Sequence, residues 1–308
     1  MWAEKGLTGY PKYVSPFGNL KQRGIKMEIN KFVRIVFLCL SIIVGWSQSA
    51  FCADNETNQP AIQCDGYIVE SPRICDIDST IKLLRESNMS FARFSDGEFR
   101  GILEKYEPFQ KPSKALSLRL KEILSSKNPN VMIGIPSPLF SLEGYKEDEV
   151  EFWTEYKPIF MPLLEKLNAD QVYFPSEISA LSERIKSQEG MEAFFSKIRT
   201  IWQDKDVHLI RGKGIFDGFK YDIFDNAKSV TYQIAPNRDA FERYDVILAE
   251  ALRAGKGKLI IIVLGPTATV LAYDLGVKGY KALDMGHIAK AYDRYKRGWK
   301  DPRFWMPD

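Results

Sequence analysis

Two carboxylates flank a glycine near residue 97 and could hold a divalent cation. Residues 93–99 read Arg-Phe-Ser-Asp-Gly-Glu-Phe, which places Asp96 and Glu98 on either side of Gly97. A glycine lets the backbone bend tightly, so both carboxylates can converge on one ion, and their oxygens suit Mg²⁺ or Mn²⁺. A purely structural role stays open, with Asp96 as a helix N-cap and Glu98 in the first helical turn.

A turn of small residues could bind phosphate. Residues 265–269 read Gly-Pro-Thr-Ala-Thr and precede a helical pattern. Backbone N–H groups at the start of a helix bind anions, and proline fits a first helical turn. The expected phosphate-binding residues are Gly265, Pro266, Thr267, Ala268 and Thr269. An ordinary helix cap by Thr267, without a ligand, is the alternative.

A carboxylate and an imidazole lie close together near the end of the chain. Residues 282–287 read Ala-Leu-Asp-Met-Gly-His, so Asp284 and His287 are candidate catalytic residues. A histidine at such a place can hydrogen-bond a phosphate or move a proton. From composition alone, a purely structural role for His287 is an equal alternative.

Each of these clusters follows a predicted strand. Residues 90–94 alternate as a strand does, residues 258–264 form an apolar run, and a last strand begins after Gly279 and Tyr280. A run without alternation is typical of a central parallel strand covered on both faces. Because ligands bind at the carboxyl ends of such strands, we expect the three clusters to share one edge of a sheet.

Helical and strand patterns alternate from about residue 76 onward. This order predicts a single doubly wound, Rossmann-like α/β domain with a mostly parallel sheet. Further strands are expected at 131–135, 206–210 and 229–234, and helices from Asp78 or Ser79 and at 116–124, 149–167, 190–202 and 240–253.

The composition excludes several classes of protein. Hydrophobic residues at 45% and charged residues at 27% exclude a disordered chain. Residues 1–52 contain seven Lys/Arg and two Glu, which leaves 36 basic and 38 acidic residues in the remainder. A body that is not basic argues against a nucleic-acid partner. With two histidines and no Cys-x-x-Cys pair, a zinc site built on several histidines is also excluded.

The first part of the chain is typical of a targeting segment. Residues 35–46 are mostly apolar and shorter than the ~20 residues that span a membrane. Lys31 and Arg34 precede them, and small residues before Ala53 suit cleavage. We therefore interpret 27–52 as a signal peptide for export to the periplasm, a lumen or the medium. An uncleaved membrane anchor and a buried helix are the alternatives. Residues 1–26 are then an over-extended start or an added segment, and 53–75 a linker or stem.

Removal of the signal changes the set of cysteines. Cys39 and Cys52 leave with it, so Cys64 and Cys75 remain. Two cysteines eleven residues apart in an exported chain can form a disulfide. Two unpaired buried thiols are the alternative.

Several of these segments together resemble the bacterial GT-D-type glycosyltransferases, long known as a domain of unknown function. The most specific match is residues 265–275 with Gly279, Tyr280 and 284–287, and the others are 93–98, 224–228, Pro236, Asn237, Ala240, Phe241, Tyr244 and Asp245. The resemblance implies a Rossmann-like sheet and a sugar-nucleotide donor. It also implies that Asp96 and Glu98 hold a divalent metal, Mn²⁺ or Mg²⁺, against the diphosphate. Arg93 and Asn226 fall in matching segments and are expected to contact the donor.

The chain departs from the family in two segments. Residues 175–179 (Pro-Ser-Glu-Ile-Ser) replace a Thr-Arg-Pro-Tyr segment, and residues 214–224 replace a Ser-Arg pair and a glycine-rich segment. Each departure removes an arginine that could contact phosphate or acceptor. Arg211, Lys213 or Lys220 could replace the lost charge.

The expected function is transfer of a hexose from a nucleoside diphosphate sugar to a hydroxyl on a glycan or glycoprotein. The metal and the helix N-terminus would stabilise the departing diphosphate, and Asp284 or His287 would serve as the base. Two alternatives follow from the same residues: a sugar-nucleotide-binding protein with weakened catalysis, and a metal-dependent phosphoester hydrolase. Membrane association through residues 35–46 stays open.

Overall fold

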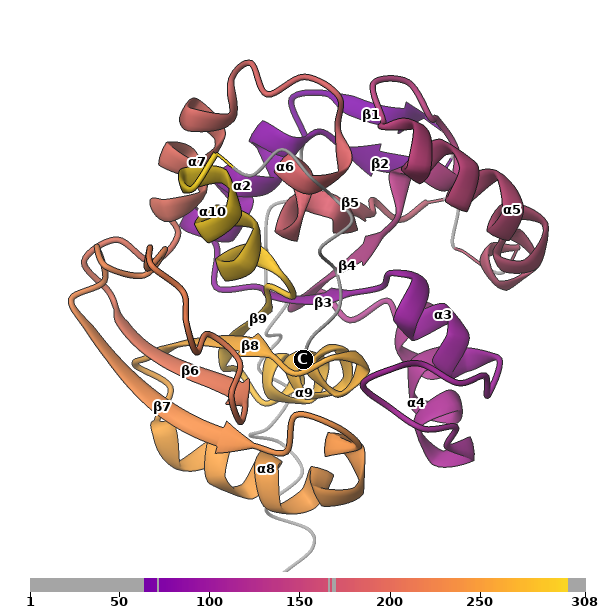
Figure 1. Cartoon of the computed structure of the whole chain (residues 1–308). Coiled ribbons are helices and arrows are strands. Elements are labelled where there is room, and N and C mark those ends of the chain that lie inside the picture. Colours follow the sequence, from indigo (N-terminus) through magenta and orange to yellow (C-terminus); the bar gives the residue numbers. More distant parts are fainter. Residues whose placement is uncertain (1–63, 71, 166, 168–169, 299–308) are drawn as a thin grey trace, which may run out of the picture. The chain divides into compact units, whose positions relative to one another are not determined.

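A seven-stranded parallel sheet forms the centre of the fold. The computed structural model describes residues 64–70, 72–165, 167 and 170–298. The strands lie in the order β5-β4-β3-β9-β8-β6-β7, and every neighbouring pair is parallel (Figure 1). Their bounds are β3 Ser90–Arg93, β4 Val131–Ile135, β5 Phe174–Pro175, β6 Asp206–Gly212, β7 Ser229–Ala235, β8 Leu259–Val263 and β9 Lys281–Asp284. The predicted fold class is confirmed.

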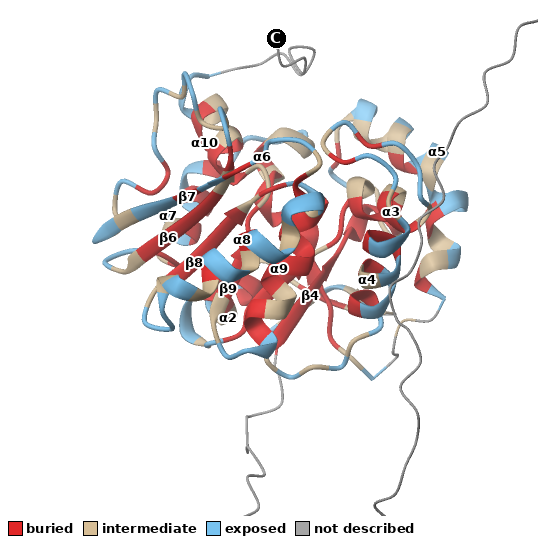
Figure 2. Cartoon of the chain, turned by 90° about the horizontal axis from the view of Figure 1, so that it is seen from below, coloured by how far each residue is buried: buried red, intermediate tan, exposed pale blue. Residues whose placement is uncertain are grey.

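Helices cover both faces of this sheet. One face packs against α2, α7 and α10, and the other against α3, α4, α8 and α9. The central strands are therefore largely buried, whereas the edge strand β7 is partly exposed (Figure 2). The α-helices are α2 Ile77–Glu86, α3 Asp96–Ile102, α4 Lys114–Leu124, α5 Glu147–Leu164, α6 Leu181–Arg184, α7 Met191–Arg199, α8 Tyr244–Ala251, α9 Pro266–Val277 and α10 Ile288–Lys296. Short 3-10 helices are η1 Ser137–Leu139, η2 Ser176–Ser179, η3 Ala240–Arg243 and η4 Leu252–Ala254.

The sequence patterns explain most of these elements. In β8 the run Leu-Ile-Ile-Ile-Val is almost wholly buried, because side chains of a central strand alternate between two covered faces. Helix α2 begins two residues earlier than expected. Its N-cap is Asp76, whose carboxylate accepts a hydrogen bond from Ser79 N at 2.7 Å, rather than Asp78 or Ser79. The sequence patterns did not predict β5, because a strand of only two residues shows no periodicity.

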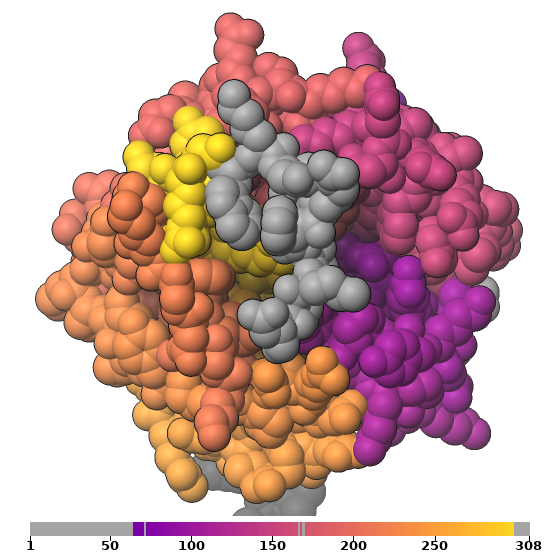
Figure 3. Space-filling model, viewed as in Figure 1, coloured from indigo at the N-terminus to yellow at the C-terminus, as the bar shows by residue number. Residues whose placement is uncertain are grey.

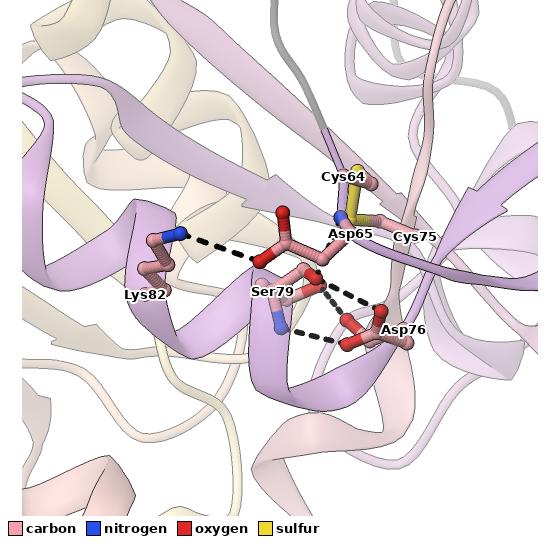
Figure 4. The surroundings of a disulfide bond; sticks show 7 residues. Cys64, Asp65, Cys75, Asp76, Ser79 and Lys82 are labelled. Atoms are coloured by element: carbon pink, nitrogen blue, oxygen red, sulfur yellow. Dashed lines mark hydrogen bonds and ion pairs between the residues drawn. A yellow bond between two sulfur atoms is a disulfide. The ribbon is translucent and has the colours of Figure 1, made fainter.

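A small hairpin precedes the sheet. Strands β1 (Tyr67–Glu70) and β2 (Arg73–Cys75) pair antiparallel, and Cys75 N donates to Tyr173 O at 2.9 Å. A disulfide joins Cys64 to Cys75, with a Cα–Cα distance of 5.7 Å (Figure 4). The predicted pairing is therefore confirmed. The expected linker or stem, residues 53–75, overlaps this hairpin, so folded structure begins before residue 76.

The expected targeting segment, residues 27–52, lies outside the described residues, as do residues 1–26. Within the part that the structure describes, no helix combines the length and the apolar character needed to cross a bilayer.

Candidate active site

Two adjoining cavities lie at the carboxyl ends of the central strands. The larger has a volume of about 370 Å³ and the smaller about 200 Å³. Residues that line both are Arg93, Phe109, Gly265 and His287. Arg93 ends β3, Gly265 follows β8, and His287 follows β9. The three sequence clusters therefore meet at one edge of the sheet, as expected for a doubly wound fold.

The smaller cavity is lined by the expected metal-binding pair. Asp96 is the first residue of α3, and its side chain is 38% exposed. Glu98 is buried, and its Oε2 accepts a hydrogen bond from Ser95 N at 2.6 Å, which forms a capping box. The N-cap is therefore Ser95 rather than Asp96. Glu98 stabilises the start of the helix while it also lines the cavity.

A third carboxyl group, which the sequence did not single out, lines the same cavity. Glu107 is buried, and its Oε2 accepts a hydrogen bond from Phe109 N at 2.8 Å. Burial raises the pKa of Glu107 to about 7 and the pKa of Glu98 to about 8. Within the described ranges no three His, Cys, Asp or Glu side chains are arranged as a metal site.

A buried ion pair joins the ends of β3 and β9. Arg93 Nε lies 3.6 Å from Asp284 Oδ1, and the two side chains are 12% and 1% exposed. Asp284 also accepts hydrogen bonds from Gly286 N at 3.0 Å and from Thr269 Oγ1 at 3.3 Å. Burial raises the pKa of the Asp284 carboxyl even though Arg93 opposes this shift. Asp284 is thus held by three neighbours at the floor of the larger cavity.

The expected phosphate turn divides into exposed and buried residues. Gly265 lines both cavities and Pro266 lines the smaller one. Gly265 has φ +53°, and a Cβ at this position would lie 3.3 Å from Phe109 Cβ, so glycine is required here. In contrast Thr267, Ala268 and Thr269 are fully buried within α9 and line neither cavity. Only the beginning of the turn faces the cavities.

Helix α10 adds two cationic groups to the larger cavity, which Arg93 also lines. His287, Lys290 and Arg294 line it and follow the spacing that places residues on one face of a helix. Burial lowers the pKa of Lys290 to about 8 and holds the pKa of His287 well below its usual value. Arg294 Nη1 donates to Glu183 Oε1 at 2.6 Å. His287 is therefore neutral near pH 7.

Some expected residues lie elsewhere. Asn226 precedes β7 at the amino edge of the sheet, where its Nδ2 donates to Arg199 O at 3.1 Å, so the structure does not bring it to either cavity. Arg211 donates to the Ile215 carbonyl and lies 5.5 Å from the Phe216 ring. The described residues that line the two cavities do not include Arg211, Lys213 or Lys220. Instead, Lys290 and Arg294 line the larger cavity.

The two segments that differ from the family pattern, residues 175–179 and 214–224, have different roles. Residues 214–219 form a wall of the larger cavity. In residues 175–179 the buried Glu177 accepts hydrogen bonds from Tyr145 Oη at 2.9 Å and from the Ser137 hydroxyl. This segment is therefore fixed by a buried polar network, and only Ser179 of it lines the smaller cavity.

A family model described as the glycosyltransferase GT-D fold matches residues 91–303. The chain belongs to this family. A probable glycosyl transferase from Streptococcus gordonii is 32% identical over 256 residues, which cover 82% of this chain and 38% of that protein. The glycosyltransferase GlyD of Streptococcus pneumoniae serotype 4 is 29% identical over 225 residues, 73% of this chain and 28% of that one. The chain thus spans about a third of the length of these relatives.

Solved structures show the same fold. One, described as a new glycosyltransferase from Streptococcus sanguinis, has a TM-score of 0.69 and 32% identity, covering 73% of this chain and 85% of its own. Another, described as a domain of unknown function with a distinct glycosyltransferase fold, has a TM-score of 0.68 and 30% identity, covering 72% and 80%. The resemblance noted in the sequence is confirmed, and glycosyltransferases act on a sugar donor and an acceptor.

Proposed function

We propose that this GT-D glycosyltransferase domain transfers a hexose from a nucleoside diphosphate sugar to a hydroxyl of a glycan or glycoprotein. The observation that carries the proposal is the meeting of Arg93, Asp96, Gly265, Asp284 and His287 around two adjoining cavities. Cationic groups and the Gly265 backbone N–H at the start of a helix suit a diphosphate, and carboxylates suit the cation that accompanies it.

The residues of the smaller cavity fit a divalent metal. Asp96 and Glu98 offer carboxylate oxygens, which Mg²⁺ and Mn²⁺ prefer. One or two carboxylates are sufficient when substrate phosphates and water complete the coordination. A bound metal would supply charge stabilisation for the departing diphosphate. A nearby cation would also favour the ionised form of Glu98, opposing the shift that burial causes.

The chain's own groups would perform the remaining tasks. Arg93 and the N-terminus of α9 at Gly265 would bind and orient the diphosphate, because both lie on the wall shared by the two cavities. His287 is the better candidate for the base that takes the acceptor proton, since burial keeps its imidazole neutral. Asp284 is already held by Arg93, Thr269 and Gly286, so its proposed role is to fix Arg93.

The test is turnover of a panel of nucleoside diphosphate sugars with Mn²⁺, Mg²⁺ or a chelator. We expect release of nucleoside diphosphate that depends on metal, and a loss of at least about 100-fold in metal-dependent nucleotide binding in Asp96→Asn. Glu122→Gln on α4, an exposed carboxylate outside both cavities, is the matched control. Unchanged nucleotide affinity in Asp96→Asn, measured by calorimetry with Mn²⁺, would contradict the assignment.

A binding protein with weakened catalysis is the second candidate. The observation that favours it is Glu177, which lies where the family has an arginine-containing segment and is buried in a polar network. Tight donor binding without transfer or hydrolysis would favour this candidate over the enzyme.

We further propose that the domain works outside the reducing cytosol. The Cys64–Cys75 disulfide supports this location, because disulfides persist in oxidising compartments. Such a location requires that the nucleotide sugar, normally made in the cytosol, be imported into the same compartment.

A further inference from the structure

One wall of the larger cavity is a loop rather than a helix or strand. Residues 213–228 join β6 to β7. Within this connection, Ile215, Phe216 and Phe219 of the loop 213–224 line the cavity. Phe216 has φ +81°, a backbone conformation that a bulky residue rarely adopts. Its ring stacks on Phe219 with a centroid distance of 5.5 Å. Because Phe216 disfavours this conformation, the loop needs stabilising bonds from its surroundings.

Those bonds come from Asp293 in α10 and from Arg297, the C-cap residue of this helix. Asp293 is buried, and its Oδ1 accepts hydrogen bonds from Lys220 N at 2.7 Å and Tyr221 N at 3.0 Å. Arg297 Nη2 donates to Gly218 O at 2.6 Å, and its Nε lies 2.9 Å from Asp293 Oδ2. In Figure 3 the yellow surface of α10 directly adjoins the orange surface below it, consistent with these contacts.

Asp293 and Arg297 do not line the cavity themselves. The cavity is lined by His287, Lys290 and Arg294, which lie on the neighbouring face of the same helix. Helix α10 therefore has two functions at once. One face lines the larger cavity with charged groups, and the adjacent face holds the loop that also lines this cavity.

We propose that Asp293 and Arg297 are positioning residues for donor binding. They hold residues 213–224 so that Phe216 and Phe219 face the larger cavity, and the affinity for the donor nucleotide depends on them without direct contact. This inference rests on the proposed function, because it assumes that the larger cavity takes part of the donor.

The experiment compares Asp293→Ala, Asp293→Asn and Arg297→Ala in the full chain. Asparagine keeps the Oδ1 acceptor for Lys220 N and Tyr221 N, whereas alanine removes it. Lys296→Ala is the matched control, because Lys296 lies on α10 but contacts Glu192 at 3.9 Å instead of the loop. Loop order is measured by trypsin cleavage after the exposed Lys220. Nucleotide affinity is measured by calorimetry with uridine, guanosine and adenosine diphosphates and Mn²⁺.

We expect Asp293→Ala to be cleaved after Lys220 at least about tenfold faster and to bind nucleoside diphosphate about tenfold more weakly. The KM for the donor should rise by a similar factor while kcat changes less than about twofold, since uniform binding is lost. Asp293→Asn should stay within about threefold of the wild type in all three measurements. If Asp293→Ala does not fold, Arg297→Ala, which leaves the carboxylate in place, gives the same test with a smaller effect.

Two results would overturn the proposal. One is faster cleavage of the loop with unchanged nucleotide affinity, and the other is an unchanged cleavage rate in Asp293→Ala. If the wild type binds none of the three diphosphates, the proposed donor class is wrong, while the cleavage rates still decide whether Asp293 holds the loop.

Discussion

The two cavities share a wall but differ in the groups that line the rest of each. The smaller one brings the carboxyl groups of Asp96, Glu98 and Glu107 together with the guanidinium groups of Arg100 and Arg184. The larger one combines the aromatic rings of residues 213–224 with cationic groups of α10. Under the proposed function, the carboxylates of the smaller cavity would hold the metal, and the cationic groups of the larger cavity would bind the phosphates.

The shared wall contains a buried ion pair. Arg93 lines both cavities and is the group that pairs with the buried Asp284. If the pair is broken, both cavities should change together. If a group in one cavity is changed, only that cavity should respond. The following predictions test this distinction.

The largest effect is expected from Arg93→Gln. The substitution leaves Asp284, whose side chain is 1% exposed, without its cation, and such a loss costs ~3–5 kcal/mol of unfolding free energy. Urea denaturation of the ligand-free protein measures this change. Adding Asp284→Asn should restore more than half of the loss. Arg100→Gln is the control, because its pair with Asp96 spans 3.9 Å at 27% and 38% exposure and should contribute ~1 kcal/mol or less. Equal losses in the two arginine variants would contradict the special role of the shared wall.

A smaller effect is expected in the larger cavity alone. The pKa of Lys290 is about 8, so its ammonium is charged below this pH and neutral above it. Metal-free diphosphate affinity should therefore fall as the pH rises through about 8. Lys290→Gln should bind about tenfold more weakly at pH 7, or ~1.4 kcal/mol, and should lose this pH dependence.

Lys296→Gln, on the same helix but outside the cavity, should keep the wild-type profile. Metal binding in the smaller cavity, followed by Mn²⁺ titration without nucleotide, should be unaffected in Lys290→Gln. A change there would show that the two cavities are not separable.

The smallest effect concerns two buried threonines of α9. Thr267 Oγ1 is buried with no hydrogen-bond partner among the described residues, so Thr267→Val should raise the unfolding free energy by ~1 kcal/mol. Thr269 Oγ1 donates to Arg93 O at 2.9 Å and contacts Asp284, so Thr269→Val should lower it by ~1–2 kcal/mol. Thermal denaturation of the two variants checks the opposite signs. A fall in both would mean that the Thr267 hydroxyl has a partner.

The sequence predicted the sheet and its functional edge for physical reasons. The buried run of β8 and the clusters after β3 and β9 carry strong local patterns, and parallel strands bring their carboxyl ends together. Gly265 could be found because its neighbours mark a strand-to-helix turn. Thr267 and Thr269 are buried because the chain enters α9 at Pro266 and this helix packs against the sheet.

Other parts of the site depend on contacts that a local pattern does not contain. Glu107 and Phe109 reach the cavities because residues 103–113 fold back, with Phe109 O accepting from Asp239 N at 2.8 Å. The resemblance to the family predicts that Asn226 contacts the donor, yet this residue lies at the amino edge of the sheet. For α10 a signal did exist, since Lys290 and Arg294 continue the helical face that begins at His287.

The position of β9 has a consequence for how the protein forms during synthesis. This strand is the last one among the described residues, yet it lies between β3 and β8, pairing Leu283 with Phe91 on one side and with Ile261 on the other. Until residues 281–284 leave the ribosome, β3 and β8 each present an unpaired edge. The nascent chain therefore joins its two groups of strands late, and the same event brings Asp284 and His287 to the site. A chain interrupted before β9 would have neither a continuous sheet nor a complete cavity.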